Sequence, residues 1–374
     1  MIEIIEVKTR RDAREFVNFP LRLYKGCPYF VPPIYADELK LVLSGGNTEN
    51  ALSVFFLAKK DGVTAGRIQG IIERQHNEKQ NKKQVRFTRF DSINDIEVAR
   101  ALFSAVEKWA FDRQMTEIVG PLGYSDLDRE GLLVEGFEEN STFEEQYNYQ
   151  YYPALMDELG FVKDADWVEF ELSLPNEKND KLSRVAERCL RANGLHVASA
   201  DMSKRKYINK YRDGFFSCLE ECYRKLYGTV PISKSAQDEL ISQFMQIVDK
   251  RFLVIICDKD EKVVAFGLCF PAIGDALKPS GGRLTPLALL RVLRAVNDPE
   301  VLDLGLVAVL PEYQMKGVNA VILDALMKML EKGNVKRCET NLNLETNTAV
   351  MSQWKHFNKR MHKRRRCYIK EISV

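Results

Sequence analysis

Apolar residues recur along the chain at two spacings, one typical of strands and one of helices, and the two alternate. Near residue 60, two strand-like runs flank Lys60-Asp61-Gly62, where an Asp-Gly pair favours a hairpin turn. The elements predicted for the first half are strands over 53–72, a helix over 95–114, a strand over 116–121, a helix over 151–161 that ends at Gly160, and a strand over 167–172.

The second half repeats this order of elements. Its predicted elements are two strands within 252–270, a strand over 301–310, a helix over 317–332, a strand over 336–344, a helix over 347–360 and a strand over 366–372. Two further helices, over 181–193 and 206–227, precede them. The repeated order indicates a duplicated α/β (α+β) unit, in which each copy has a mixed, mostly antiparallel sheet flanked by helices.

A polar run at 173–181, which contains Pro175, separates the two halves. It places a domain junction near residue 176, with domains over 1–175 and 176–374. A chain of 374 residues is long for a single hydrophobic core, which also favours two domains.

Composition excludes several classes of protein. The 55 basic residues nearly balance 53 acidic ones, so no global positive field predicts DNA binding. None of the eight cysteines forms a two-residue-spaced pair, which argues against a metal site and suits a reducing compartment. No run approaches the roughly 18 apolar residues of a membrane span, and the first residues lack a signal-peptide core. We therefore expect a soluble, cytoplasmic protein with no metal, no DNA partner and no membrane contact.

The stretch VLPEYQMKGVNA, residues 309–320, carries the strongest chemical signal. A buried strand ends at Leu310, a loop follows, and a helix begins near Gly317. The first amides of a helix have no intrahelical partner, and the helix dipole favours negative charge there. Lys316 adds a positive charge at the same place. The pattern therefore predicts an anion cradle that suits phosphate.

This stretch resembles the acyl-CoA pyrophosphate-binding segment of the GNAT N-acyltransferase superfamily. Gln314 and Gly317 match that segment's pattern, whereas Asn319 stands where a small residue is usual and Ala320 follows it. The resemblance implies that the coenzyme is acetyl-CoA or another acyl-CoA, used as a co-substrate. It assigns the pantetheine arm to the backbone of Val307 and Val309, and a second coenzyme contact to Asn347. The pyrophosphate would be held by the amides of Met315, Lys316, Gly317, Val318, Asn319 and Ala320.

The first half resembles the superfamily more loosely. It carries only DSIND between Phe90 and Ile96, so we expect its domain to keep the fold without a coenzyme site. Two of its segments, residues 19–33 and 120–161, are similar to bacterial proteins of about this length that are known only as GNAT-like. Together these resemblances imply tandem GNAT-like domains and transfer of an acyl group, with acetyl as the expected group, to the amine of a small molecule or a peptide.

Such a transfer needs a base for the amine and a proton donor for the departing thiolate. Glu345 follows a predicted strand and is the candidate base; alternatively, it caps the next helix or is solvated. Trp354 fills the place where many relatives carry the donor tyrosine, and an indole cannot donate to the thiolate in that way. His356 or Tyr368 could replace it, although a surface histidine and a packed strand tyrosine are also consistent with the pattern.

Two further clusters leave alternatives open. The run at 355–367, with seven basic residues, suits a phosphate, an acidic partner or RNA, or else a solvated helix end. The tyrosines of EEQYNYQYY, residues 144–152, suit an amine pocket or core packing. Cys218 and Cys222, one helical turn apart, are expected in the core. The alternative functions are a non-catalytic acyl-CoA-binding or regulatory protein, and a Fem-type transferase that uses aminoacyl-tRNA.

Overall fold

The computed structural model describes residues 1–372 except 176–179, 225, 233, 235–236, 239 and 242–246. It divides into two compact units. Unit 1 comprises Met1–Val168, Ile273–Val292 and His362–Val374, and unit 2 comprises Glu169–Ala272 and Leu293–Met361. The junction expected near residue 176 lies outside the described residues. The units also differ from contiguous domains over 1–175 and 176–374, because 273–292 and 362–374 belong to unit 1.

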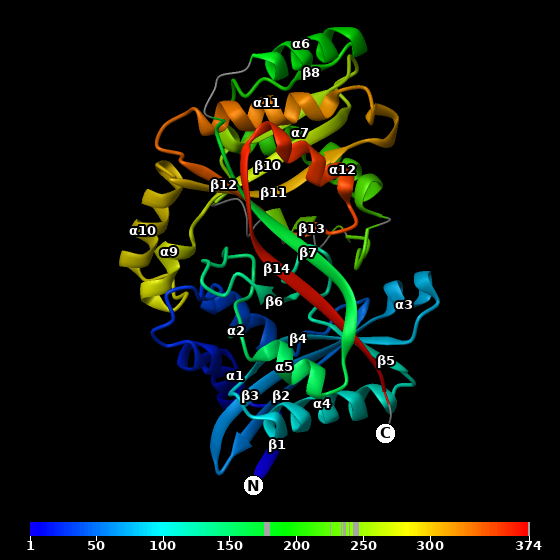
Figure 1. Ribbon diagram of the computed structural model, residues 1–374, viewed down its shortest axis with the longest axis vertical. Helices are drawn as coiled ribbons and strands as arrows, with labels where there is room; N and C mark the ends of the chain where they lie inside the picture. The colour runs from blue at the N-terminus through cyan, green and yellow to red at the C-terminus, as the bar shows by residue number, and fades with distance from the viewer. Residues whose placement is uncertain are drawn as a thin grey trace. The chain divides into compact units, whose positions relative to one another are not determined.

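Unit 1 is built on a mixed sheet (Figure 1). Its strands β4 and β5 are parallel, and the other pairs between the strands named below are antiparallel. Its strand order is β1 (Ile2–Glu6), β2 (Ala51–Lys60), β3 (Val63–Glu73), β4 (Gln84–Ser92), β5 (Glu117–Gly120) and β14 (Asn358–Glu371), with β6 (Leu132–Glu135) also on β14. The helices of this part are α1 (Arg10–Leu23), α2 (Tyr35–Leu43), α3 (Arg74–Gln80), α4 (Ile96–Phe111), α5 (Tyr152–Glu158), α9 (Gly274–Leu277) and the start of α10 (Pro286–Asn297).

The β2–β3 hairpin forms as its sequence predicts. Asp61 and Gly62 both have positive φ, 52° and 81°, as a two-residue turn between twisted strands requires. Helix α4 then packs closely on β3 through its apolar face. A Cβ on Gly66 of β3 would lie 2.7 Å from Leu102 of α4, so the bare glycine sets how near the helix approaches the sheet.

Unit 2 repeats this construction. Its strand order is β7 (Val162–Ser173), β12 (Arg337–Thr340), β11 (Val301–Val309), β10 (Val263–Pro271), β9 (Leu253–Cys257) and β8 (His196–Val197). Its helices include α6 (Lys181–Asn193), α7 (Lys204–Tyr223), α11 (Val318–Leu330) and α12 (Thr348–Met351). Strands β10 and β11 are antiparallel, and α11 connects β11 to the parallel strand β12. Gly267 of β10 corresponds to Gly66 of unit 1, since a Cβ added to it would lie 2.7 Å from Ile322 of α11. The expected duplicated α/β fold is confirmed.

The C-terminal region differs from the prediction. The prediction of a helix over 347–360 is wrong. Helix α12 is a single turn and is followed by a 3₁₀ turn at Ser352–His356. Strand β14 then starts at Asn358, whereas the predicted strand starts at 366. The reason is that Lys and Arg fill inward positions of a strand. Arg365 is fully buried, 3.2 Å from Glu145, and the Lys363 ammonium donates to the Asn140 carbonyl at 3.1 Å. Such pairing offsets the cost of burying a charge. The basic run is therefore largely a paired strand, not a solvated helix end.

The tyrosine-rich segment packs in the core of unit 1. Tyr147 and Tyr152 are buried, and the rings of Tyr147 and Tyr149 contact Tyr24. Their hydroxyls are also engaged, for example that of Tyr147 with the Phe137 carbonyl. Core packing accounts for these rings. Over the described part of the chain, no helix is long and apolar enough to cross a membrane.

Candidate active site

Over the described residues, one edge of β11 has no strand partner in the second half of the strand. Its parallel pairing with β12 ends at Leu304 and Thr340, whereas its pairing with β10 continues to Val309. A bulge at Gly305 marks the point where β11 departs from β12. The Leu310 amide donates to the Val264 carbonyl beside β10, so by strand alternation Val307 and Val309 direct their backbone groups to the open edge.

The loop after β11 leaves several amides without partners. A 3₁₀ turn at Pro311–Tyr313 leads to Met315, which has φ 63° and is fully exposed, and then to Gly317, with φ 85°. Helix α11 begins at Val318 without a side-chain cap. Among the described residues, no hydrogen-bond acceptor lies on the amides of Met315, Gly317, Val318 or Asn319. The Ala320 amide, by contrast, donates to the Gly317 carbonyl at 3.0 Å.

Helix α6 fixes the direction of the central peptide in this loop. The carbonyl of Lys316 accepts from the Cys189 thiol at 3.3 Å and from the Asn193 amide at 3.5 Å. In a trans peptide the N–H points opposite to the C=O. Since the Lys316 carbonyl is directed at α6, the Gly317 amide is directed away from it. Contacts within the protein thus set the direction of the Gly317 amide.

Side chains of the loop are also engaged. The Gln314 side-chain amide donates to the Val309 carbonyl at 3.1 Å, which closes the turn between β11 and the helix. The Lys316 ammonium lies 5.1 Å from the centre of the Tyr313 ring, a cation–π distance, and Lys316 is exposed. Gln314 therefore shapes the loop, and Lys316 supplies the positive charge at its surface.

Helix α7 brings to this edge of β11 residues that no sequence pattern indicated. The Tyr223 hydroxyl donates to the Val307 carbonyl at 3.2 Å. The pKa of the neighbouring residue Cys222 is lowered, mainly by a hydrogen bond with Cys218 and to a smaller extent by one from the Val309 amide. Burial acts in the opposite direction and raises it. Cys218 is buried as expected, but Cys222 is partly exposed. No periodicity distinguishes a helix-end tyrosine of this kind from a packing residue.

The other residues predicted from the sequence have mixed outcomes. Asn347 caps α12, accepting from the Val350 amide at 3.3 Å, so Glu345 is not the cap and stays a predicted base. Trp354 is buried and His356 is exposed. Tyr368 lies in the core of unit 1, paired with Gly120 of β5, and burial raises its pKa to about 12. A tyrosine packed in this way matches the structural alternative.

The corresponding junction in unit 1 is closed by the chain itself. Asp95 caps α4 by accepting from the Glu97 amide at 3.0 Å, and the same carboxylate pairs with Lys60. A negative side chain therefore takes the position at which an anion would meet the helix start. The two strand–helix junctions share a topology but differ in this one property.

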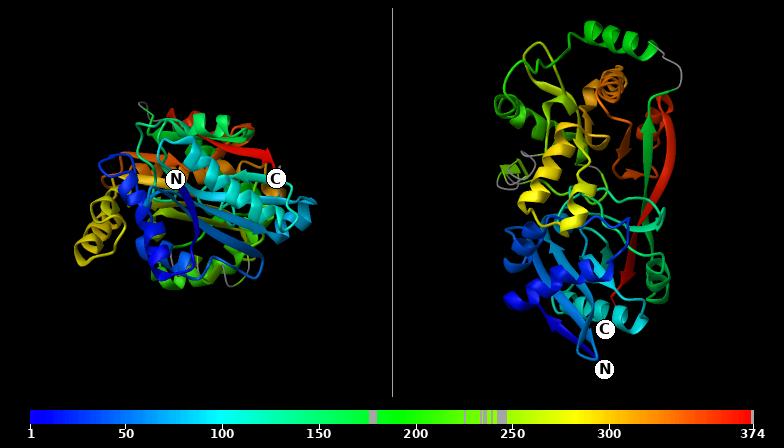
Figure 2. Two further views of the ribbon diagram at one scale, coloured as in Figure 1. Left: turned by 90° about the horizontal axis from the view of Figure 1, so that it is seen from below. Right: turned by 90° about the vertical axis from the view of Figure 1, so that its left-hand side faces the viewer.

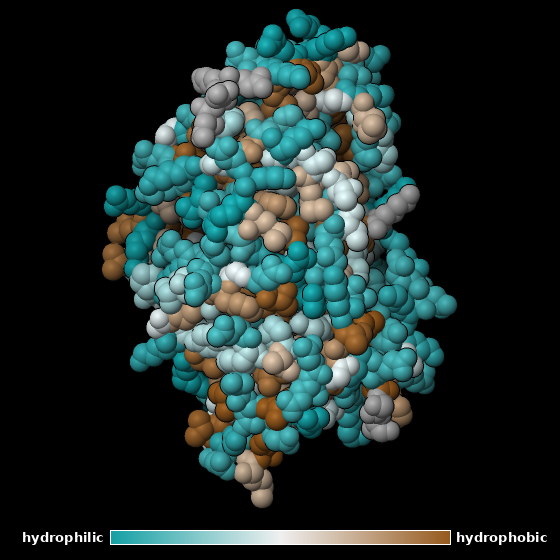
Figure 3. Space-filling model, in the orientation of Figure 1, coloured by the Kyte–Doolittle hydropathy of each residue, from teal (hydrophilic) through white to brown (hydrophobic). Residues whose placement is uncertain are grey.

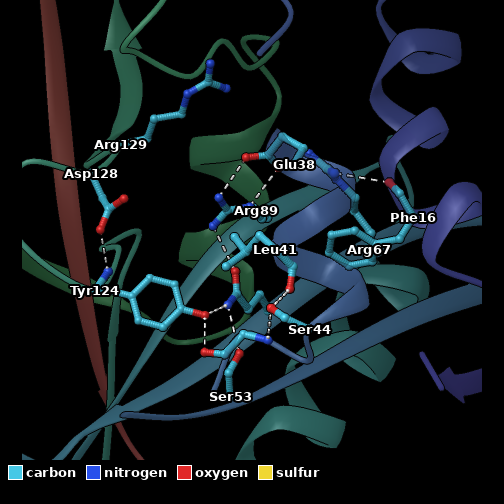
Figure 4. A network of polar contacts seen from close by, with 12 residues as sticks. Phe16, Glu38, Leu41, Ser44, Ser53, Arg67, Arg89, Tyr124, Asp128 and Arg129 are labelled. Atoms are coloured by element: carbon cyan, nitrogen blue, oxygen red, sulfur yellow. Dashed lines mark hydrogen bonds and ion pairs between the residues drawn. The ribbon is translucent and has the colours of Figure 1, made fainter. Parts of the chain in front are cut away.

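Polar side chains fill the region around β4 of unit 1 (Figure 4). Arg89 lies in a bulge of β4 with φ 49°, an uncommon value for a side-chain-bearing residue. Its guanidinium makes two bonds to Glu38, at 2.8 and 2.9 Å, and one to Gln69 at 2.9 Å. Gln69 in turn donates to Ser53 and Tyr124, both at 2.8 Å. These groups satisfy one another, as buried polar groups must.

Comparison with known proteins identifies relatives of low identity. No known family profile matches the chain. Protein YghO of Escherichia coli K12 is 25% identical over 379 residues, covering 97% of this chain and 94% of YghO. A protein named bacterial ceramide synthase, from Caulobacter vibrioides, is 23% identical over 295 residues, covering 78% of this chain and 76% of its own. A tandem GNAT protein from the clavulanic acid biosynthesis pathway, solved without acetyl-CoA, superposes with a TM-score of 0.56 at 11% identity, covering 100% and 99% of the two chains.

The Glu38–Arg89 ion pair predicts how the stability of the fold changes with pH. Burial raises the pKa of Glu38, but Arg89 outweighs it and holds that pKa at about 2, against an ordinary value of 4.5. The ionised pair therefore stabilises the fold above about pH 4.5, and this contribution is lost as the pH falls towards 2. We expect Glu38→Gln to lower the free energy of unfolding by about 3 kcal/mol at pH 7, with the difference from wild type shrinking between pH 5 and pH 3.

Urea unfolding at pH 7, 5 and 3 measures this difference. Glu97→Gln is the control, because Glu97 pairs with Arg100 at 3.6 Å on the exposed face of α4 and should change stability by less than about 1 kcal/mol. An equal effect of Glu38→Gln at all three pH values would contradict the assignment.

Proposed function

Because the chain has the tandem GNAT fold, we propose that it is an acyl-CoA-dependent N-acyltransferase whose unit 2 binds the coenzyme. The observation that carries the proposal is the start of α11, where the amides of Met315, Gly317, Val318 and Asn319 have no acceptor among the described residues. This helix start lies next to the part of β11 that extends beyond its pairing with β12. Such a helix start binds phosphate through its amides and its dipole. The capped start of α4 in unit 1 supports a single coenzyme site.

In this proposal the diphosphate of acyl-CoA lies on the amides of Met315, Gly317, Val318 and Asn319, near the Lys316 ammonium. The pantetheine arm then runs along β11 away from the loop, towards Gly305. The Val307 amide, which the register leaves without a strand partner, donates to the arm. This direction places the thioester beyond Val307.

The reaction joins an amine to the acyl carbonyl and releases the coenzyme thiol. The attacking nitrogen must lose a proton, for which Glu345 remains the proposed base, and the departing sulfur must gain one. Tyr223 has its hydroxyl at the Val307 carbonyl, so we propose it as the donor to the thiolate in place of the tyrosine that Trp354 replaces. Neither His356 nor the buried Tyr368 is needed in this scheme.

For the acyl group, we propose a fatty acyl chain in preference to acetyl. The support is the relative named bacterial ceramide synthase, since a ceramide is the amide of a fatty acid and a long-chain amino alcohol. The acceptor would then be a long-chain amine. Acetyl transfer to a small amine or a peptide amine is the second candidate, because solved structures that share the fold include GCN5-related N-acetyltransferases.

The experiments below also distinguish two other functions. A binding or regulatory protein would hold acyl-CoA without releasing thiol. A Fem-type transferase would use aminoacyl-tRNA, but the basic run that favoured it has Lys363 and Arg365 buried in β14. We therefore rank it below the other two.

A charge placed at the helix start tests the coenzyme site. Gly317→Glu should weaken CoA binding at least tenfold, because it brings a negative charge to the helix start at which phosphate is proposed to bind. Gly333→Glu is the matched control: Gly333 lies just beyond the other end of α11, with φ 65° against 85°, and open space around its Cβ. Both variants carry the same new charge and similar backbone strain of about 1–2 kcal/mol. Calorimetry with CoA distinguishes them, and equal affinities in the two folded variants would rule out the site.

Thiol release identifies the reaction. With sphinganine as acceptor, we expect palmitoyl-CoA to release thiol at least tenfold faster than acetyl-CoA, and mass spectrometry to show the N-acyl product. Faster release from acetyl-CoA would reject the fatty acyl proposal while keeping the transferase. CoA binding without thiol release from either thioester, over a panel of amines, would leave a binding protein.

The role of Tyr223 has its own test. Tyr223→Phe should lower kcat by about 10²-fold or more, the usual loss of a general acid, with little change in CoA affinity, since the ring remains. Its effect should also diminish with a thioester whose thiol is more acidic, because such a thiolate leaves without a proton. A loss of CoA binding in place of kcat would indicate that Tyr223 only supports β11.

A further inference from the structure

Helix α10 carries a row of leucines on its outer surface. Leu287 and Leu290 are both 64% exposed, and Leu284, Leu289 and Leu293 are also exposed. Ala288 and Val296, on the opposite side of the helix, are buried. At 100° per residue, the exposed leucines of the helix fall on one continuous arc, and the buried residues on the other. In Figure 2, right, the helix lies yellow at the surface, and Figure 3 has a brown patch where Figure 1 places α10.

The charged residues of the segment that carries these leucines are all basic. From residue 276 to residue 297 the sequence contains no Asp or Glu. At 100° per residue, Arg294 lies between Leu290 and Leu287, and Arg291 lies on the other side of Leu287, so the two arginines flank Leu287 at one end of the leucine arc. Arg283, just before the helix, is exposed and stacks on Tyr35 at 4.0 Å. The face is thus mainly apolar, with its positive charge gathered around Leu287 and just before the helix.

We propose that α10 is a membrane-surface helix that docks this chain onto an anionic lipid bilayer. An amphipathic helix with leucines on one side and arginines beside them lies in the plane of the interface, with binding that grows with buried apolar area and with anionic lipid. Arginine stems reach along the apolar layer while their heads stay among the phosphates. The inference does not depend on the proposed reaction.

The helix is suited to lying on a bilayer and not to crossing one. Twelve residues span only about 18 Å, against roughly 30 Å of hydrocarbon. No spanning helix is present among the described residues, but a surface helix does not need one. The expectation of no membrane contact was based on the length of apolar runs, which does not test for a surface helix.

A protein partner fits the surface less well. Energetically important residues of protein interfaces are mainly Trp, Tyr and Arg, with Leu under-represented. The arc on α10 has leucines and no aromatic residue. Its uninterrupted positive charge complements lipid phosphates, whereas a second copy of this chain would bring like charges together.

Vesicle flotation tests the proposal with the full chain. We expect it to float with vesicles of phosphatidylglycerol and phosphatidylcholine at 3:7, and at least tenfold less with pure phosphatidylcholine. Leu287→Glu combined with Leu290→Glu should reduce binding at least tenfold. Arg291→Gln combined with Arg294→Gln should remove most of the difference between the two lipid compositions.

The matched control adds the same two charges to exposed apolar residues elsewhere. Leu43→Glu with Phe111→Glu replaces side chains that are 48% and 52% exposed and lie outside α10, and it should bind like wild type. As a second measurement, Leu290→Trp should show a blue-shifted tryptophan emission with anionic vesicles that lipids brominated in the acyl chain quench.

Three results would overturn the proposal. Wild type could fail to float with either vesicle, or the two double-Glu variants could lose binding equally. Sedimentation could instead show a dimer that the α10 variant dissociates, without vesicle binding, and the occupant would then be a second copy of the chain.

Discussion

The direction of one peptide group governs the proposed coenzyme site. Two donors from α6, the Cys189 thiol and the Asn193 amide, bind the Lys316 carbonyl, and a trans peptide must then present the Gly317 amide on the opposite side. Positive φ at Met315 and Gly317 lets the chain make this turn directly before α11. The site is therefore set by a helix that is distant in sequence. Preorganisation of this kind reduces the ordering cost of ligand binding.

The two units share a fold but differ at the residues that would form a coenzyme site. Both have an antiparallel strand pair, a crossover helix and a parallel strand, and in both a strand glycine admits the helix. They diverge at the helix start, where unit 1 has the Asp95 carboxylate and unit 2 has Gly317. Around the bulge of β4, unit 1 also contains the mutually bonded Glu38, Gln69 and Arg89. One acidic side chain and one polar network are enough to distinguish them.

Local signals in the sequence were sufficient where a local rule governs the backbone. The Asp61-Gly62 turn, the apolar face of α4 and the glycine before α11 follow from positive φ and helical periodicity. The C-terminal strand could not be predicted in the same way, because Lys363 and Arg365 are buried only through partners more than 200 residues away, Asn140 and Glu145. Tyr223 was missed for the same reason: its contact with Val307 depends on how α7 packs, which no pattern within α7 encodes.

The passage of β14 from unit 2 into the sheet of unit 1 has a consequence for biosynthesis. Residues 117–120 of β5 pair with residues 368–371, so β5 lacks its partner on that side until residue 371 has left the ribosome. Unit 1 therefore cannot finish folding before that point, although most of its residues are made much earlier. Its unpaired edge persists during the synthesis of some 250 intervening residues, as an opportunity for misassociation or for a chaperone.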